Sequence, residues 1–261
     1  MNYQHIKVSS KDHIVTIELS RPEVLNAINQ QMHDELQYVF DDFASNDDLY
    51  LAVVRGAGSR AFSAGSDLKA IAKAGKPNTY PKNGYAGLIE RYDLTKPIIA
   101  AVDGVAVGGG FEVALACDIL IATTRSRFGL PEPKIGAIAL GGGVHRLARQ
   151  IGLKKAMGLI LSADIIDAEE GDRLGFITEM VAPEDFESAV DKWCEKILAC
   201  APLATRASKE TVMRGLDEPS LEAAMQAQAT YPSFKEFYSS EDRHEGALAF
   251  AEKRPPNWQG K

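Results

Sequence analysis

The stretch KPIIAAVDGVAVGGGFEVALACDILIATTRSRFGL, residues 96–130, places three consecutive glycines and a carboxylate within an apolar segment. Residues 97–102 have the continuous apolar character of a buried strand. Gly108 to Gly110 precede a helix that we expect to begin near Phe111. Glu112 then falls in the first turn of that helix, so the stretch predicts one wall of an active site.

Glycines and a helix start together suit a ligand that carries negative charge. Glycine lets the backbone approach a ligand closely, and the first turn of a helix leaves N–H groups unpaired. Such donors stabilise a carbonyl oxygen that becomes an enolate, and one donor changes a rate by roughly 10²- to 10³-fold. The alternative is that the glycines only permit close packing and that Glu112 caps its own helix.

Composition and charge bound the class of protein. The chain has 261 residues, of which 45% are hydrophobic and 25% charged, which fits one main domain with an appendage. Its net charge of −7 disfavours nucleic acid as the main partner. The three cysteines, Cys117, Cys194 and Cys200, show no CxxC spacing and no neighbouring histidine ligands, so we predict neither a disulfide nor a metal site.

The sequence also disfavours a membrane protein. Residues 97–122 come closest to an apolar span, but Asp103, Glu112 and Asp118 interrupt them. The N-terminal residues lack the apolar segment of a secretory signal. We therefore expect a cytoplasmic protein with no membrane partner.

Strands and helices alternate in the first part of the chain. Residues 14–19 alternate apolar and polar side chains, as in a half-buried strand, and residues 51–55 predict a second strand. Residues 29–46 repeat apolar side chains at spacings of three and four, which predicts a helix with one buried face. The glycine-rich connection after the second strand ends in a helix that we expect to start near Ser66 or Asp67.

Residues 72–87 gather Gly, Pro, Asn and Lys without apolar periodicity, so we expect a mobile surface loop. A lid over a neighbouring pocket and an ordinary solvated connection both fit this composition. Further elements are expected beyond the central region. They are strands over residues 119–123 and 176–181 and helices over residues 156–162 and 168–174.

The last part of the chain predicts only helices, over residues 186–199, 203–215, 221–237 and 244–252. These helices are short, and their apolar faces must pack on the main domain or on a neighbouring subunit. We therefore divide the chain into a core over residues 1–182, which holds the site, and a second, helical region over residues 183–261.

A second carboxylate, Glu132, follows Glu112 by twenty positions in the segment FGLPEPKIG, residues 128–136. The expected strand over residues 119–123 lies between the two. One strand out and back returns the chain to the same place, so both carboxylates can serve one site.

Several motifs, taken together, resemble the enoyl-CoA hydratase/isomerase, or crotonase, family. They are RPEVLNA (21–27), AFSAGSDL (61–68), IAAVDGVAVGGGFE (99–112), FGLPEPKIG (128–136) and the tail LAFAEKRPPNW (248–258). The resemblance covers nearly the whole chain in order. It implies an α/β fold, a crotonase-like spiral of ββα units, with a C-terminal α-helical trimerisation region and often a dimer of trimers.

The resemblance also implies the chemistry. Family members bind an acyl-CoA thioester with its oxygen between two backbone N–H groups, which match Ser66 and Gly109 here. Hydratases of the family keep two glutamates, and the matching positions are Glu112, which would hold the water, and Glu132, which would exchange the proton at the α-carbon. Two structural glutamates on a scaffold that only binds CoA are the alternative.

The CoA-binding segments follow from the same resemblance. Ala64, Ser66, Asp67 and Leu68 match the segment that lies along adenine and pantetheine. In the tail, Phe250 and Lys253 match positions that reach the CoA phosphate or adenine, sometimes across a subunit boundary. No cofactor is implied, because coenzyme A is part of the substrate, and no metal is expected.

Within the family, the segments 63–70, 84–116 and 231–258 look most like the carnitinyl-CoA dehydratase branch. One departure concerns GAIALGGG, residues 136–143, where the family commonly has a proline followed by Gly or Asp and this chain has Ala139 and Leu140. Leu140 would then place an apolar side chain at the acyl pocket. The expected activity is hydration of an enoyl-CoA, and the alternatives are the carnitinyl branch, isomerisation, hydrolysis or a non-catalytic scaffold.

Overall fold

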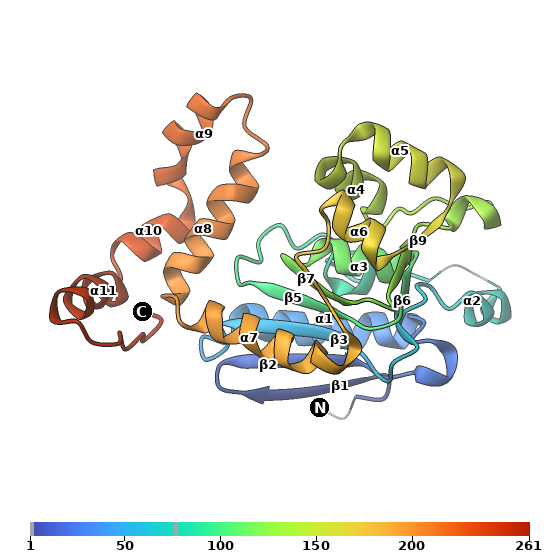
Figure 1. Cartoon of the computed structure of the whole chain (residues 1–261), viewed down its shortest axis with the longest axis horizontal. Helices are drawn as coiled ribbons and strands as arrows, with labels where there is room; N and C mark the ends of the chain where they lie inside the picture. Colours follow the sequence, from blue (N-terminus) through green and yellow to red (C-terminus); the bar gives the residue numbers. More distant parts are fainter. Residues whose placement is uncertain (1–2, 76–77) are drawn as a thin grey trace.

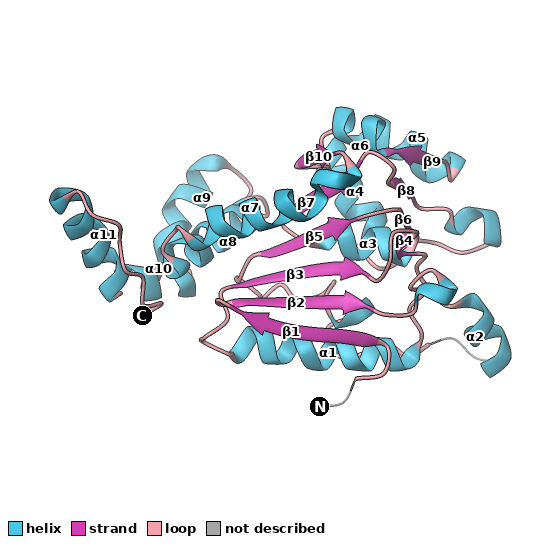
Figure 2. Cartoon of the chain, turned by 60° about the horizontal axis from the view of Figure 1, so that its bottom comes forward, coloured by secondary structure: helices cyan, strands magenta, loops and turns pink. Residues whose placement is uncertain are grey.

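A six-stranded sheet forms the centre of the chain. The structure is a computed structural model that describes residues 3–75 and 78–261. The strand order is β1-β2-β3-β5-β7-β10, and all neighbours are parallel except β1 and β2 (Figure 2). The strands are β1 (Ile6–Lys11), β2 (Ile14–Leu19), β3 (Leu51–Gly56), β5 (Ile98–Val102), β7 (Ile119–Thr123) and β10 (Glu179–Val181).

A smaller sheet has the order β4-β6-β8-β9. Its strands are β4 (Ala61–Ser63), β6 (Val105–Val107), β8 (Arg127–Gly129) and β9 (Ile165–Asp167). The strands β3, β5 and β7 of the large sheet are each followed along the chain by one strand of the small sheet. The next elements are α2 (Leu68–Ala74) after β4, α3 (Gly109–Ala116) after β6, and the 3-10 helix η3 (Glu132–Ile135) with α4 (Gly143–Ile151) after β8. The expected repetition of ββα units is confirmed.

Helices cover both faces of the large sheet. The helix α1 (Gln30–Ser45) begins after Asn29, whose side chain accepts a hydrogen bond from the Met32 N–H at 3.0 Å. Its buried residues are Met32, His33, Leu36, Val39, Phe40 and Phe43, and the apolar ones pack into the larger core cluster as the periodicity predicted. The helix α7 (Phe186–Leu198) packs on the opposite face against Leu51 and Val53 of β3.

The helices α5 (Leu153–Ser162) and α6 (Ala168–Leu174) lie with α4 on one side of the sheets (Figure 1). The last four helices extend away from the sheets in the same view. They are α8 (Pro202–Gly215), α9 (Leu221–Ala227), α10 (Pro232–Tyr238) and α11 (Glu241–Glu252). Helix α7, which follows residue 183, packs on the sheet, so the extended part begins with α8.

Two expected elements are corrected. The single helix over residues 221–237 is wrong, because it breaks into α9, the 3-10 helix η5 (Gln228–Thr230) and α10. Pro232 begins α10 and Tyr231 before it is extended, as a residue preceding proline prefers. The strand over residues 176–181 is shorter than expected, because only Glu179 to Val181 pair with β7.

The segment 72–87 also differs from the expected surface loop. Its first residues belong to α2, and residues 76 and 77 lie outside the described part of the chain. Its end, the 3-10 helix η2 (Tyr85–Gly87), is buried.

The remaining 3-10 helices are η1 (Pro22–Val24) and η4 (Pro183–Asp185). Within residues 3–75 and 78–261, no helix is both long enough and apolar enough to traverse a bilayer.

Candidate active site

Two glycine-rich corners meet at the start of α3. Gly65 has a φ of +79°, and a Cβ atom added there would lie 2.8 Å from the Gly109 nitrogen. A Cβ atom on Gly110 would lie 2.2 Å from the carbonyl oxygen of Ser63. Only glycine permits these approaches, so the glycines bring the chain around Ser66 against the first turn of α3.

The backbone N–H groups of Ser66 and Gly109 are available to a ligand. Gly109 is the first residue of α3, where no preceding helical carbonyl exists. The chain on either side of Ser66 is held by Ile28, whose N–H donates to Gly65 at 2.7 Å and whose carbonyl accepts from Asp67 at 3.0 Å. Neither N–H has an acceptor among the residues that the structure describes. Two such donors are suited to an oxygen that gains negative charge.

Glu112 projects from the first turn of α3 into the protein interior. Its exposed fraction is 3%, and its Oε1 atom accepts a hydrogen bond from the Gly143 N–H at 2.8 Å. A Cβ atom on Gly141 would lie 2.5 Å from Oε2, so these glycines leave room for the carboxyl group. Burial raises the pKa of Glu112 to about 7, the charge of Glu132 adds to the rise, and the Gly143 amide opposes it.

Glu132 begins η3 on the other side of the same corner. A Cβ atom on Gly108 would lie 3.0 Å from its Oε1 atom. Its Oε2 atom is buried and has no hydrogen-bond partner in residues 3–75 and 78–261. Burial raises the pKa of this carboxyl group as well. The expected return of the chain is confirmed, because β7 leads out and β8 pairs with β6 just before Gly108.

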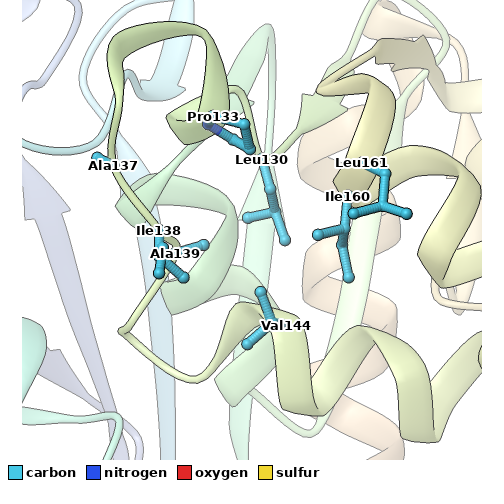
Figure 3. Close-up of a pocket in the computed structure, with 8 residues that line it drawn as sticks. All are labelled: Leu130, Pro133, Ala137, Ile138, Ala139, Val144, Ile160 and Leu161. Carbon is cyan, nitrogen blue, oxygen red and sulfur yellow. The ribbon is translucent and has the colours of Figure 1, made fainter.

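An apolar cavity of about 260 Å³ lies beside Glu132, between η3, the following loop, α4 and α5 (Figure 3). Its lining residues are Leu130, Pro133, Ala137, Ile138, Ala139, Val144, Ile160 and Leu161. Leu140, which we expected at an acyl pocket, is not among them and has an exposed fraction of 74%. The segment before Leu140, rather than Leu140 itself, therefore borders this cavity in the single chain.

The residues matched to CoA binding near α2 have different surroundings. Asp67 is buried, caps α2 by accepting from the Ala70 N–H at 3.0 Å, and pairs with Arg21 at 2.9 Å. Its contacts in the chain thus stabilise the corner itself. Ala64 is partly exposed and Leu68 is exposed, so both are open to a ligand.

Phe250 and Lys253 lie at the other end of the molecule. Phe250 lies in the last turn of α11 and Lys253 directly follows that helix, and Figures 1 and 2 place α11 opposite α2. Phe250 has an exposed fraction of 87%. The structure therefore does not bring these two residues to residues 64–68 of their own chain, which the resemblance matched to CoA binding.

Tyr85, which the sequence analysis did not assign to this corner, also lies beside Gly109. Its side chain is only 2% exposed, and the Ser66 hydroxyl donates to its hydroxyl oxygen at 3.2 Å. A Cβ atom on Gly109 would lie 2.3 Å from that oxygen. The motif GYAG was the available signal, since Gly84 and Gly87 both have positive φ and turn the tyrosine inward.

Comparisons with known proteins identify the family and the fold. Residues 9–261 match the family model described as enoyl-CoA hydratase/isomerase. The chain is 38% identical over 253 residues to a carnitinyl-CoA dehydratase of Escherichia coli K12, covering 95% of both chains. It is 33% identical to the (E)-benzylidenesuccinyl-CoA hydratase of Thauera aromatica, over 98% of this chain and 99% of that one. An enoyl-CoA hydratase structure from Mycobacterium marinum superposes with a TM-score of 0.91 at 37% identity, over 98% of this chain and 99% of that one.

Proposed function

Because the chain belongs to the enoyl-CoA hydratase/isomerase family, we propose that it adds water across the double bond of a trans-2-enoyl-CoA or removes it from a 3-hydroxyacyl-CoA. One observation supports this function above others. Two carboxyl groups, of the buried Glu112 and the partly buried Glu132, flank a corner where two backbone N–H groups have no acceptor among the described residues. This arrangement combines proton transfer with stabilisation of a negative oxygen.

The thioester oxygen binds between the N–H groups of Ser66 and Gly109. When water attacks the β-carbon, the electron pair of the double bond moves toward this oxygen and forms an enolate. The two donors and the helix start at Gly109 stabilise that charge. Fixed backbone donors need no rearrangement during the reaction, because the glycine contacts hold the corner in place.

The two glutamates transfer the protons. In hydration, Glu112 accepts a proton from the water whose oxygen bonds to the β-carbon, and Glu132 gives its proton to the α-carbon. Solvent exchange then resets both carboxyl groups, so the balance is one water added. Burial raises the pKa of both carboxyl groups, and the pKa of about 7 lets Glu112 take up and release a proton near neutral pH.

Coenzyme A lies along Ala64 to Leu68, and the phosphate or adenine end meets Phe250 and Lys253 of a neighbouring copy. The distance of α11 from α2 supports a contribution across a subunit boundary. Helices α8 and α9 also expose large apolar side chains that suit a protein partner. They are Val212, Met213, Leu221 and Met225, and Leu216 directly after α8 is exposed as well.

We predict a trimer or a dimer of trimers, in the cytoplasm. Light scattering at micromolar concentration measures the assembly, and a strictly monomeric mass would reject it. Cell fractionation tests the location. In a monomer, the exposed apolar side chains of α8 and α9 would promote aggregation, so we expect the protein to exist as an oligomer.

The activity is tested with a panel of trans-2-enoyl-CoA esters. We expect loss of the absorbance of the conjugated thioester and formation of the 3-hydroxyacyl-CoA. Release of free CoA or movement of the double bond without water uptake would instead indicate hydrolysis or isomerisation. Binding of the esters without any turnover would indicate a scaffold.

A further inference from the structure

Residues 83–91, which we call the aromatic loop because they carry Tyr85, form hydrogen bonds with two helices. Asn83 forms two hydrogen bonds with the side chain of Gln37 on α1, of 2.9 and 3.0 Å. On the other side, Arg146 of α4 donates to the carbonyl of Ile89 at 2.7 Å. The helix α4 also supplies the N–H group that binds Glu112. The loop is thus positioned by the same elements as the proposed site.

The hydroxyl group of Tyr85 is placed within reach of a shared ligand oxygen. A Cβ atom on Gly109 would lie 2.3 Å from the hydroxyl oxygen, and such an atom is roughly 2.5 Å from its own backbone nitrogen. The hydroxyl oxygen is therefore within about 5 Å of the Gly109 nitrogen. Two donors that each lie about 2.9 Å from one acceptor have a separation of this size.

The proton of the Tyr85 hydroxyl is not used within the described chain. The only hydrogen bond found for this group there is the one from the Ser66 hydroxyl, in which the Tyr85 oxygen accepts. A buried hydroxyl normally donates as well as accepts. The unused donor faces the corner that holds the free N–H groups of Ser66 and Gly109.

We propose, on the basis of the hydratase function above, that the Tyr85 hydroxyl is a third hydrogen-bond donor to the thioester oxygen, beside the N–H groups of Ser66 and Gly109. The hydroxyl accepts from Ser66 and donates to the substrate, so the serine side chain orients it. A donor that is already oriented stabilises the developing enolate without the cost of rearrangement.

The surroundings keep this hydroxyl protonated. Burial raises the pKa of Tyr85, and the charges of Glu112 and Glu132 raise it further, while the bond from Ser66 opposes the rise. His33 packs edge-on against the Tyr85 ring with centroids 4.6 Å apart. Burial lowers the pKa of His33 to about 4, so this ring is neutral at physiological pH and does not draw the tyrosine proton away.

The test is Tyr85→Phe, which keeps the ring and removes only the hydroxyl. We expect kcat for hydration to fall at least about tenfold with KM changed less than about threefold, since two backbone donors remain. The matched control is Tyr92→Phe, because Tyr92 lies just beyond the aromatic loop with an exposed fraction of 84%. It should leave both parameters unchanged. Equal thermal midpoints of both variants and the parent exclude a folding defect.

A second measurement needs no turnover. Acetoacetyl-CoA bound to the protein ionises to an enolate with its own near-ultraviolet absorbance, and the fraction ionised reports how well the site stabilises a negative oxygen. We expect Tyr85→Phe to reduce the bound enolate about tenfold at a given pH and Ser66→Ala to reduce it less. Unchanged kcat and enolate fraction in Tyr85→Phe, or a change in KM alone, would overturn the proposal. If the parent hydrates no ester but binds the enolate, the hydratase function fails while the donor role of Tyr85 is still measured.

Discussion

Glu112 and Glu132 come from two regions that hold the same side chain differently. Glu112 lies in a regular helix inside the core, and a backbone amide of α4 satisfies one of its oxygens. Glu132 lies on a short 3-10 helix at the edge of an apolar cavity, and its buried Oε2 atom has no partner in the described residues. The fixed carboxyl group suits the positioning of water, and the unpartnered one suits proton exchange with a substrate carbon.

Removal of either carboxyl group is expected to have the largest effect. Glu112→Gln and Glu132→Gln should each lower turnover by at least about 10²-fold while CoA-ester binding stays nearly unchanged, because each removes proton transfer but little contact area. Steady-state kinetics with a trans-2-enoyl-CoA and a binding titration with the same ester measure the two quantities. A near-normal rate in one variant would reject the role assigned to that residue alone.

The buried environment of Glu112 also predicts that the free energy of unfolding depends on pH. In the folded protein the pKa of Glu112 is about 7, against an ordinary value of 4.5, so between these pH values the folded state holds a proton that the unfolded state releases. The free energy of unfolding therefore falls as pH rises through this window. The contribution of the Glu112 proton is fully present below about pH 4.5 and is lost above about pH 7. Across this window the free energy of unfolding falls by up to about 3 kcal/mol.

Glu112→Gln removes this titration, so its unfolding free energy should vary less with pH than that of the parent. Urea unfolding at pH 5 and pH 8 measures the difference. Glu23→Gln is the control, because Glu23 is exposed on the 3-10 helix η1 and should follow the parent. Parallel curves for Glu112→Gln and the parent would show that the buried carboxyl group does not titrate in this range.

The sequence predicted the fold best where a pattern is long enough to repeat. The buried face of α1 was visible because its apolar residues recur over sixteen positions, and β2 because its side chains alternate. The strands of the small sheet were not predicted, since three residues are too few to show alternation. Pro232 was the missed signal for the break between α9 and α10.

The candidate site shows the same limit at the level of single residues. The glycine corners and both carboxyl groups were visible as motifs in the chain. The inward direction of the Tyr85 side chain was not visible in the sequence, because it depends on the hydrogen bonds between the aromatic loop and the helices α1 and α4. The pairing of Asp67 with Arg21 joins segments far apart in sequence, which local patterns cannot show.

The smallest expected effect is on the choice between a charged and an uncharged acyl group, and it depends on the apolar cavity beside Glu132. All residues that line this cavity are apolar, and Leu140 next to it adds no charge. A quaternary ammonium needs a carboxylate or aromatic faces, and a cation–π contact contributes roughly 0.5 to 2 kcal/mol. Tyr80, Tyr85, Tyr92 and Phe128 are the aromatic residues that could supply such faces. Phe128 is fully buried in the core and Tyr92 is exposed, which leaves Tyr80 and Tyr85.

We therefore predict that a short uncharged enoyl-CoA has a higher kcat/KM than crotonobetainyl-CoA, which carries a trimethylammonium group. An apolar lining offers no group whose contact would offset the free-energy cost of desolvating that cation. Measuring kcat/KM for both esters decides the question, with Leu140→Asp as the variant that should narrow the gap if Leu140 meets the acyl group. A tenfold preference for the charged ester, about 1.4 kcal/mol in transition-state binding, would contradict the prediction. It would assign the aromatic faces to Tyr80 and Tyr85, and Tyr80→Leu would then have to abolish the preference.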